Sequence, residues 1–307
     1  MESKWLEDFI SLARTGSFTQ AARDRNITQP ALSRRIRALE IWAGADLIDR
    51  SGYPARLSAA GEEFLAVASD VNTTLNRARA ELRNKRAGGP TAYRFAAPHS
   101  ISIHFLAGTL HEMADTLPDV KTRILSDNLY TCCQYLNESA CDFLLCFEHP
   151  NIAVSLDPTR FVRTALTQDR LIPVCCPSSD KSPQPRWQLG SAKHRVLPVL
   201  GYSEGVFFES VVTSMIKNRN DALRIRHVDA LSEVLKRLAI RGAGVAWLPE
   251  SSIRDELRDG RLLPAVSAGD DSWTAPLTLC LYTDPSQLDK NGRQIWIWIT
   301  ENSTKLQ

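Results

Sequence analysis

Residues 17–40, SFTQAARDRNITQPALSRRIRALE, constrain the fold more than any other stretch, because they predict two short helices joined by a tight turn. Ser17 followed three residues later by Gln20 is the pattern of a capping box, in which each side chain satisfies the other residue's backbone N–H. Thr28 is the next N-cap candidate, and Pro30 falls in the first turn, where a missing N–H costs nothing. We expect the second helix to run from Thr28 to about Glu40.

This second helix has an apolar side and a polar side. Helical spacing places four apolar residues inward and four polar residues near one outward stripe; they are Ala31, Leu32, Ile36 and Leu39, and Gln29, Ser33, Arg34 and Arg37. Arginine hydrogen-bonds guanine, glutamine bonds adenine, and serine or threonine bonds several bases. An ordinary two-helix corner with a solvated basic face is the alternative. The combination of caps, turn and arginines favours a helix-turn-helix whose second helix enters the DNA major groove.

The flanking segments fit the same domain. Residues 3–15 predict an amphipathic helix, with Trp5, Phe9, Leu12 and Ala13 on the face that would form the core. Residues 47–50 and 55–58 predict two short strands around the turn residues 51–54, which makes a wing. Arg50 and Arg56 lie on this hairpin, where they would contact phosphates or the minor groove, unless they are ordinary surface arginines.

A long helix follows the wing. Ser58 is its predicted cap, and apolar residues recur at spacings of 4, 3, 4, 3 and 4; they are Phe64, Ala68, Val71, Leu75, Ala78 and Leu82. At ~1.5 Å per residue, residues 59–86 would form a rod about 42 Å long. Since no neighbouring helix in the sequence would cover this seam, we expect it to dimerise with a second chain; packing on the protein's own body is the alternative. Residues 87–90, AGGP, predict a hinge.

The remaining chain alternates strands and helices, which predicts parallel sheets covered by helices and two subdomains with a ligand crevice between them. Several polar residues follow predicted strands and are candidate effector contacts; they are His99, Ser100, Asn128, Glu148, Ser203 and Glu204. His99 and Ser100 also begin a predicted helix, whose N-terminus suits an anion. Simple polar loop caps are the alternative for each residue.

Composition narrows the function further. The net charge is +2, so evidence for nucleic-acid binding rests on the local arginines. The sequence has no GxSxG, HExxH, P-loop or GxGxxG motif, which disfavours an α/β enzyme, and we expect no enzymatic activity and no cofactor or metal. The start MESKWLEDF does not read as a signal peptide and no run of 18 apolar residues occurs, so we expect a cytoplasmic protein and not an exported solute-binding protein. Seven cysteines without a CxxC pair are more typical of core packing than of redox sensing, although a thiol sensor stays open.

The chain resembles the LysR-type transcriptional regulators over its whole length. The motifs that carry the resemblance are WLEDFISLARTGSFTQAARDRNITQPALSRRIRALE, LIDRSGYPARLSAAGEEFL and GAGVAWLPE. The resemblance implies a winged helix-turn-helix at 1–58, a linker and dimerisation helix with a hinge at 59–90, and a two-lobed effector domain like a periplasmic binding protein at 91–307. Lobe I would span about 91–160 and 270–307, and lobe II about 161–269. It also implies a homotetramer on double-stranded DNA, switched by a small effector, with RNA polymerase as a candidate partner. Thr28, Gln29, Pro30, Ser33, Arg34, Arg37 and Arg50 would be its DNA contacts, with Arg56 beside them on the wing.

Within this family, the segments ESKWLEDF and SEVLKR resemble the hypochlorite-responsive regulator of enteric bacteria. That subfamily is associated with methionine oxidation. This chain contains only Met1, Met113 and Met215, and it carries Phe207 and Leu231 where the sensor's methionines would align. An oxidant-sensing regulator is therefore the alternative to a regulator switched by an anionic effector.

Overall fold

The computed structural model describes residues 2–25, 27–49, 55–86, 92–179, 182–190, 196–217, 219 and 222–302. The chain forms two compact units, one over Met1–Thr91 with Asn137–Ala140 and one over Ala92–Leu136 and Cys141–Gln307. Among the described residues, no helix is both long and apolar enough to cross a membrane.

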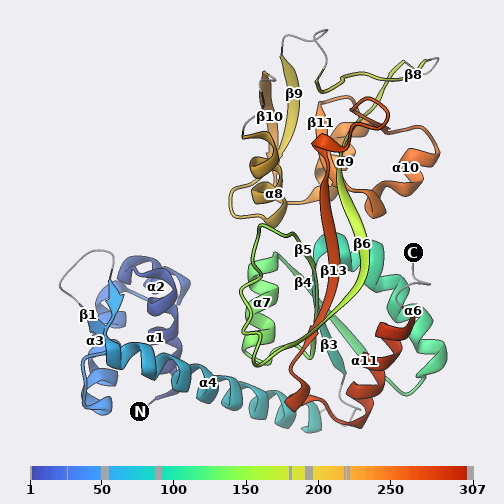
Figure 1. Cartoon of the computed structure of the whole chain (residues 1–307). Coiled ribbons are helices and arrows are strands. Elements are labelled where there is room, and N and C mark those ends of the chain that lie inside the picture. The colour runs from blue at the N-terminus through green and yellow to red at the C-terminus, as the bar shows by residue number, and fades with distance from the viewer. Residues whose placement is uncertain are drawn as a thin grey trace. The chain divides into compact units, whose positions relative to one another are not determined.

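The N-terminal unit is a small helical domain with a two-stranded wing (Figure 1). Its elements are α1 (Ser3–Thr15), α2 (Phe18–Asp24), α3 (Gln29–Ala43), β1 (Ile48–Asp49), β2 (Arg56–Leu57) and α4 (Ala59–Arg86). α3 continues beyond the predicted end at Glu40, because the first left-handed residue is Gly44, at φ 74°. Glycine adopts this conformation without a steric penalty, which is why the helix ends there.

The core of this unit is built from the helical faces that the sequence predicts. Leu6, Phe9 and Leu12 of α1 pack with Ala21 and Ala22 of α2. The same cluster contains the apolar face of α3 and the first wing strand, namely Leu32, Ile36, Leu39, Leu47 and Ile48. Small residues on α2 allow the helices to approach closely, which fixes the position of α3 within the unit.

The C-terminal unit is organised around one mixed sheet. Its strand order is β10-β9-β11-β6-β13-β5-β3-β4, with β12 paired to β6, and a separate hairpin joins β7 to β8. The strands are β3 (Tyr93–Pro98), β4 (Thr122–Asp127), β5 (Phe143–Glu148), β6 (Val162–Cys175), β7 (Pro177–Ser179), β8 (Ser182–Pro185), β9 (Leu197–Tyr202), β10 (Leu223–Asp229), β11 (Val245–Pro249), β12 (Leu263–Pro264) and β13 (Ala275–Thr283).

Two long strands connect the lobes of this sheet. β3, β4 and β5 form a parallel group in lobe I, and β9, β10 and β11 form a second parallel group in lobe II. β6 and β13 run antiparallel to each other through both lobes (Figure 1). The prediction of parallel sheets is therefore correct for each group but wrong for the strands that join them, because β6 and β13 cross between the lobes in opposite directions.

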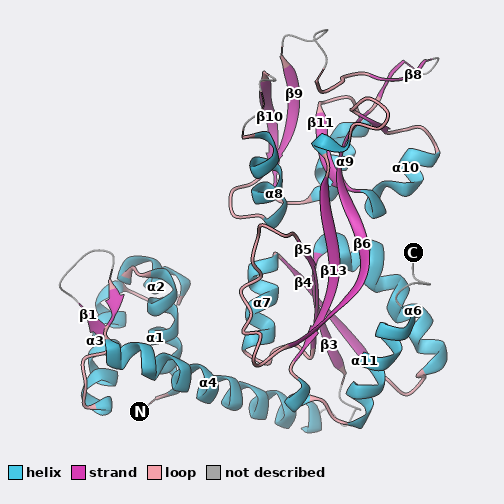
Figure 2. Ribbon diagram, viewed as in Figure 1, coloured by secondary structure: helices cyan, strands magenta, loops and turns pink. Residues whose placement is uncertain are grey.

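Helices cover both faces of the sheet (Figure 2). In lobe I, α6 and α11 lie on one side and α7 on the other, and in lobe II α9 packs against β11 and β9. The helices are α5 (His99–Ile101), the π-helical turn η1 (Ser102–Leu106), α6 (Ala107–Thr116), α7 (Leu129–Asn137), α8 (Phe207–Ile216), α9 (Ser232–Ile240), the 3-10 turn η2 (Glu250–Ile253), α10 (Arg254–Arg258), the 3-10 turns η3 (Asp271–Trp273) and η4 (Pro285–Gln287), and α11 (Lys290–Asn302).

Candidate functional site: a DNA-binding helix and an effector cleft

Helix α2 has an N-cap at Ser17, but only one of the two hydrogen bonds of the predicted capping box forms. The backbone N–H of Gln20 donates to Ser17 Oγ at 3.4 Å. The reciprocal bond is absent, because Gln20 Nε2 donates to Asp24 Oδ1 at 3.0 Å and the Ser17 N–H donates to Thr15 Oγ1 at 3.4 Å. The two helices still begin as predicted, at Phe18 and Gln29, and Thr28 is the N-cap of α3 without a side-chain cap bond.

The outward face of α3 is available to a ligand. Thr28, Gln29, Pro30, Arg34 and Arg37 are exposed, and Ser33 is half-buried. Among the described residues, neither Arg34 nor Arg37 has a hydrogen-bond or ion-pair partner in the structure. The structure therefore brings the predicted recognition-helix residues together on one accessible surface.

Arg35, between these two arginines, has a structural role. It donates from Nη1 to Asp8 Oδ2 at 3.0 Å, and Arg25 donates from Nε to Asp8 Oδ1 at 2.9 Å. Asp8 is fully buried, and a buried carboxylate is destabilising unless ion pairs compensate its charge, which Arg35 and Arg25 do. This pair of ion pairs ties α3 to α1 and fixes the angle at which the exposed arginines project.

The predicted wing is present as the hairpin of β1 and β2. Its first strand is held in place by Glu40, which was not among the predicted functional residues. Ile48 pairs with Leu57 and Asp49 with Arg56 in antiparallel register. Buried Glu40 of α3 accepts hydrogen bonds at Oε1 from the N–H groups of Leu47 and Ile48, each at 3.1 Å. Arg56 is exposed on this hairpin, and Arg50 lies outside the described residues.

The predicted dimerisation seam of α4 divides into two parts. Ala68 is buried in the core of its own unit, and the Phe64 ring lies 5.6 Å from that of Phe9, so both residues are corrected from dimer contacts to intramolecular packing. The physical reason is that α1, distant in sequence, covers this part of α4. Further along, Val71 and Leu75 are exposed at 38% and 49%. The side chains of Ala78 and Leu82 lie outside the described residues.

A pocket of about 210 Å³ lies between the two lobes of the C-terminal unit. The start of α5 contributes Pro98 to Ile101, the start of α7 contributes Asn128 and Leu129, the start of α8 contributes Val206 to Phe208, and the start of α9 contributes Leu231 and Ser232. Four helix N-termini therefore converge on one cavity. A helix N-terminus carries the positive end of the helix dipole, which favours an anion, and Asp127 at the end of β4 adds one carboxylate to the same lining.

Three of the six predicted effector residues line this pocket, namely His99, Ser100 and Asn128. Asn128 is also a helix cap, since its Oδ1 accepts from Thr131 N at 2.9 Å. The prediction is wrong for Glu148, Ser203 and Glu204, which are absent from the lining. Glu148 follows Phe147, which lines the pocket, and successive residues of a strand face opposite sides of the sheet. Ser203 and Glu204 fall in a turn with Gly205 at φ 82°, and the chain reaches the pocket only from Val206.

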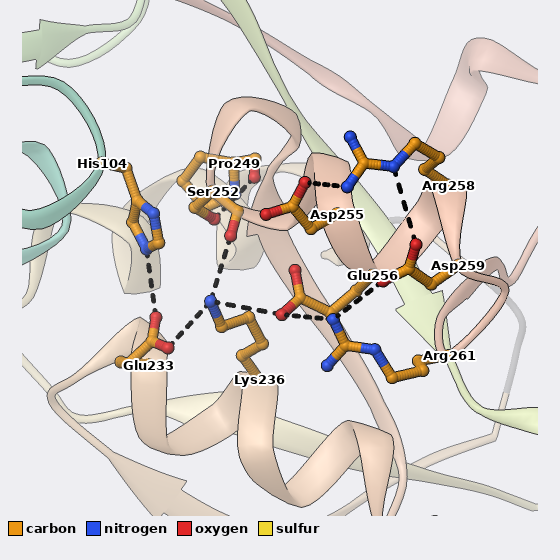
Figure 3. Close-up of polar contacts among 10 residues, drawn as sticks. All are labelled: His104, Glu233, Lys236, Pro249, Ser252, Asp255, Glu256, Arg258, Asp259 and Arg261. Atoms are coloured by element: carbon orange, nitrogen blue, oxygen red, sulfur yellow. Dashed lines mark hydrogen bonds and ion pairs between the residues drawn. The ribbon is translucent and has the colours of Figure 1, made fainter. Parts of the chain in front are cut away.

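Beside this pocket, a polar network joins the lobes (Figure 3). His104 of lobe I lies 3.1 Å from Glu233 of α9, measured from Nε2 to Oε2. Buried Lys236 donates from Nζ to Glu233 Oε1 at 2.8 Å and to Ser252 O at 3.1 Å. Burial raises the pKa of Glu233, but the hydrogen bonds from Lys236 and His104 lower it by a larger amount. The pKa of Glu233 is therefore below its usual value. Glu233 is therefore an ionised link between the lobes.

Several residues at this site were not among the predicted effector contacts. Phe147, Phe207 and Leu231 line the pocket, and His104 and Glu233 bridge the lobes. Their positions next to predicted strand ends and helix starts were the available signal for Phe147, Phe207, Leu231 and Glu233. His104 carried no such signal, because it lies in the π-helical turn η1 inside a predicted continuous helix.

Comparison with known proteins agrees with both units. Residues 3–62 match the family described as bacterial regulatory helix-turn-helix protein, lysR family, and residues 87–303 match the LysR substrate binding domain. The chain belongs to the LysR family of DNA-binding transcriptional regulators. It is 30% identical to the HTH-type transcriptional regulator YjiE of Escherichia coli K12 over 300 residues, which cover 96% of this chain and 93% of YjiE.

Solved structures of LysR regulators have the same fold. Full-length HypT from Salmonella typhimurium, a hypochlorite-specific LysR-type transcriptional regulator, aligns with a TM-score of 0.60 and 29% identity over 99% of both chains. Vibrio fischeri DarR, solved in complex with DNA, aligns with a TM-score of 0.60 and 28% identity over 98% of both chains. This LysR regulator thus has an effector-binding domain of the family's two-lobed form.

All seven cysteines of this LysR regulator are free and buried. Burial raises the pKa of Cys132, Cys133 and Cys280 to about 12 and that of Cys175 to about 11. Burial also raises the pKa of Cys141 and Cys146 well above the usual thiol range. Since the thiolate is the reactive form, these six side chains have the character of core residues and not of redox sensors.

Proposed function

We propose that this regulator binds its operators through α3 and the wing and that a small anionic effector in the interlobe pocket sets its DNA binding. The DNA contacts would be Thr28, Gln29, Pro30, Ser33, Arg34 and Arg37 of the helix-turn-helix, with Arg50 and Arg56 on the wing. Support comes from the accessible, unpaired Arg34 and Arg37.

The observation that carries the effector proposal is the convergence of four helix N-termini on one 210 Å³ pocket. A carboxylate there would accept hydrogen bonds from free N–H groups near Ser100 and Ser232. Phe147, Phe207 and Leu231 would cover an apolar part of the same molecule. A ligand that touches both lobes binds one lobe arrangement better than another, and that difference in affinity is what shifts the regulator between states.

Replacement of Ser100 by Phe tests this proposal, because the larger side chain would fill the pocket. Reporter output from a cognate promoter would be measured across a panel of organic anions. We expect Ser100→Phe to abolish the effector response while operator affinity stays within about twofold. Ser203→Phe is the matched control, since Ser203 does not line the pocket, and it should respond like the wild type. A normal response from Ser100→Phe would remove this pocket from the mechanism.

Oxidant sensing is the second candidate, favoured by the likeness to hypochlorite-specific HypT. It predicts that the response to hypochlorite survives Ser100→Phe and disappears when the cysteines or Met113 and Met215 are replaced. Met113 is 1% exposed, and Phe207 and Leu231 stand in the pocket lining. These surroundings favour the anionic effector over methionine oxidation as the signal.

The remaining organisation follows from the same proposal. Residues 1–58 would be the DNA-binding domain, 59–90 the dimerisation helix and hinge, and 91–307 the regulatory domain, with lobe I near 91–160 and 270–307. Two dimers would join as a homotetramer on double-stranded DNA and contact RNA polymerase. Because its ligand is DNA, we place the protein in the cytoplasm, and we propose a regulator without enzymatic activity or a cofactor.

A further inference from the structure

Lobe I contains a second cavity, of about 620 Å³, on the other side of β5 from the interlobe pocket. Phe147 lines the interlobe pocket and Glu148, the next residue, lines this one. The segment 149–161 folds back beside the sheet, with a bridge between His149 and Ile152. The volume of this cavity lies within the range of small-molecule sites, about 300–1,000 Å³.

Three residues of the sheet make a polar wall in this cavity. Arg163 donates to Glu148 at both carboxylate oxygens, from Nε to Oε1 at 2.7 Å and from Nη2 to Oε2 at 2.6 Å. The Tyr282 hydroxyl also donates to Glu148 Oε1. Burial raises the pKa of Glu148, but its hydrogen bonds to Arg163 and Tyr282 lower it by more. Glu148 therefore stays ionised, and its acceptor sites face three donors from the protein.

Among the described residues, this wall and the neighbouring His149 have two donors without a protein partner. The Nη1 group of Arg163 has no partner among the described residues. His149 Nδ1 accepts from Asn151 N at 3.3 Å, which leaves its proton on Nε2, and burial lowers the pKa of this imidazole. Asp157 adds a second negative charge to the lining beside that of Glu148, and its Oδ1 atom accepts from Thr159 N at 2.8 Å and from Thr159 Oγ1 at 2.7 Å. A ligand head that accepts hydrogen bonds would satisfy the two free donors on Arg163 and His149.

The other walls are apolar. Ile152, Val154, Leu156, Pro158, Phe161 and Val162 line the cavity. Val162 is 45% exposed although it is a large aliphatic residue. An apolar body placed against these side chains would remove their surface from water, which favours binding.

We propose that this cavity, named here the lobe I pocket, binds a second small molecule that has an apolar body and a carbonyl or carboxylate head. The head accepts hydrogen bonds from Arg163 Nη1 and His149 Nε2, and the body lies against Ile152, Val154 and Phe161. The pocket is separate from the interlobe site, so the proposal holds whether or not that site binds an anion.

Isothermal titration calorimetry of the full chain tests this with three eight-carbon probes: octanoate, 2-octanone and octylamine. We expect octanoate and 2-octanone to bind saturably and octylamine, which is a cation at pH 7, to bind at least tenfold more weakly. Ala153→Trp places a large side chain at the exposed rim without touching the polar wall, and it should weaken octanoate at least tenfold. Arg163→Met should weaken octanoate by a similar factor, whereas Arg293→Met on α11, an exposed arginine outside the pocket, should leave it unchanged.

Several results would overturn the proposal: no binding of octanoate, equal binding of all three probes, or wild-type octanoate binding by Ala153→Trp. Loss of octanoate binding in Ser100→Phe with retention in Ala153→Trp would place the probe in the interlobe pocket and would also overturn it. If Arg163→Met does not fold, Ala153→Trp decides alone, because its far-ultraviolet circular dichroism and thermal midpoint can be compared with those of the wild type.

Discussion

Arg34 and Arg35 are neighbours on α3 with different environments. Arg34 is exposed without a described partner, whereas Arg35 is paired with buried Asp8 at 3.0 Å. An arginine that contacts DNA and an arginine that supports the fold should respond differently to the same substitution. This pair therefore separates recognition from stability within one helix.

Arg34→Ala should weaken binding to a cognate promoter by ~1–3 kcal/mol and relax sequence preference if Arg34 contacts a base; if it contacts phosphate, the loss should be uniform and the salt dependence shallower. Its thermal midpoint should be unchanged. Arg35→Ala should instead lower the free energy of unfolding by about 1–3 kcal/mol, since Asp8 would keep only Arg25 as a partner. Gel-shift titrations and urea unfolding measure the two effects, and unchanged promoter affinity in Arg34→Ala would contradict the assignment of α3.

Two glycines give a further test of packing at single residues. A Cβ on Gly61 would lie 2.0 Å from the carbonyl oxygen of Leu47, whereas a Cβ on Gly108 of α6 would meet no atom within 4 Å. Gly61→Ala should therefore destabilise the protein by about 1–3 kcal/mol, because α4 and the wing strand must separate. Gly108→Ala should stabilise it by about 0.5–1 kcal/mol through helix propensity. Urea unfolding of both variants checks this, and equal effects would contradict the close approach of α4 to Leu47.

At the scale of elements, the exposed apolar residues of α4 are the part of the seam left for a second chain. Val71→Glu combined with Leu75→Glu should dissociate the linker-helix dimer, because each chain would place two charges in an apolar interface. Light scattering should show a smaller particle, and operator affinity should fall. Ala66→Glu is the control, since helical geometry places residue 66 on a different face. A double variant with wild-type mass would show that another interface holds the assembly together.

The sequence predicted the elements of the N-terminal unit well because their signals are local. Ser17 caps α2 by accepting from the N–H of Gln20, three residues away, and Leu32, Ile36 and Leu39 define the buried face of α3 by spacing alone. The same reasoning failed for Phe64 and Ala68, whose partners lie on α1, more than 50 residues earlier in the chain. Spacing shows that a face is apolar, but it does not show which segment covers that face.

The lining of the interlobe pocket was also predicted only in part. Topology predicted that His99, Ser100 and Asn128 would lie close together, because residues after parallel strands meet at one edge of a sheet, and all three line the interlobe pocket. It could not decide on which side of β5 Glu148 would point, nor how far the turn at Gly205 would carry Ser203. The sequence predicts a strand only from Leu171 to Cys176 and not the first half of β6, since only Leu166 is buried among residues 162–170 and the segment lacks a regular apolar alternation.

At the scale of the whole regulatory domain, Glu233 gives a pH dependence. Its pKa is lowered in the folded state, so its stabilising effect is present above the unfolded value of 4.5 and is lost as the pH falls through the lower folded value. Glu233→Gln should reduce stability by about 1 kcal/mol at pH 7. The difference from the wild type should shrink toward pH 3–4. Urea midpoints at pH 7, 5 and 4 measure this, with Asp255→Asn as an exposed control; a constant offset would contradict the assignment.

The order of strands in the large sheet has a consequence for biosynthesis. β13 lies between β5 and β6, although β5 and β6 precede it in the chain and Ala275 follows Cys175 by 100 residues. At a translation rate of about 5–20 residues per second, the ribosome needs roughly 5–20 s to make that interval. During this time the position of β13 is empty, so the facing edges of β5 and β6 are unpaired. Unpaired strand edges are templates for pairing with other chains. A nascent chain of this regulator therefore reaches its native sheet only when its last strand has left the ribosomal tunnel.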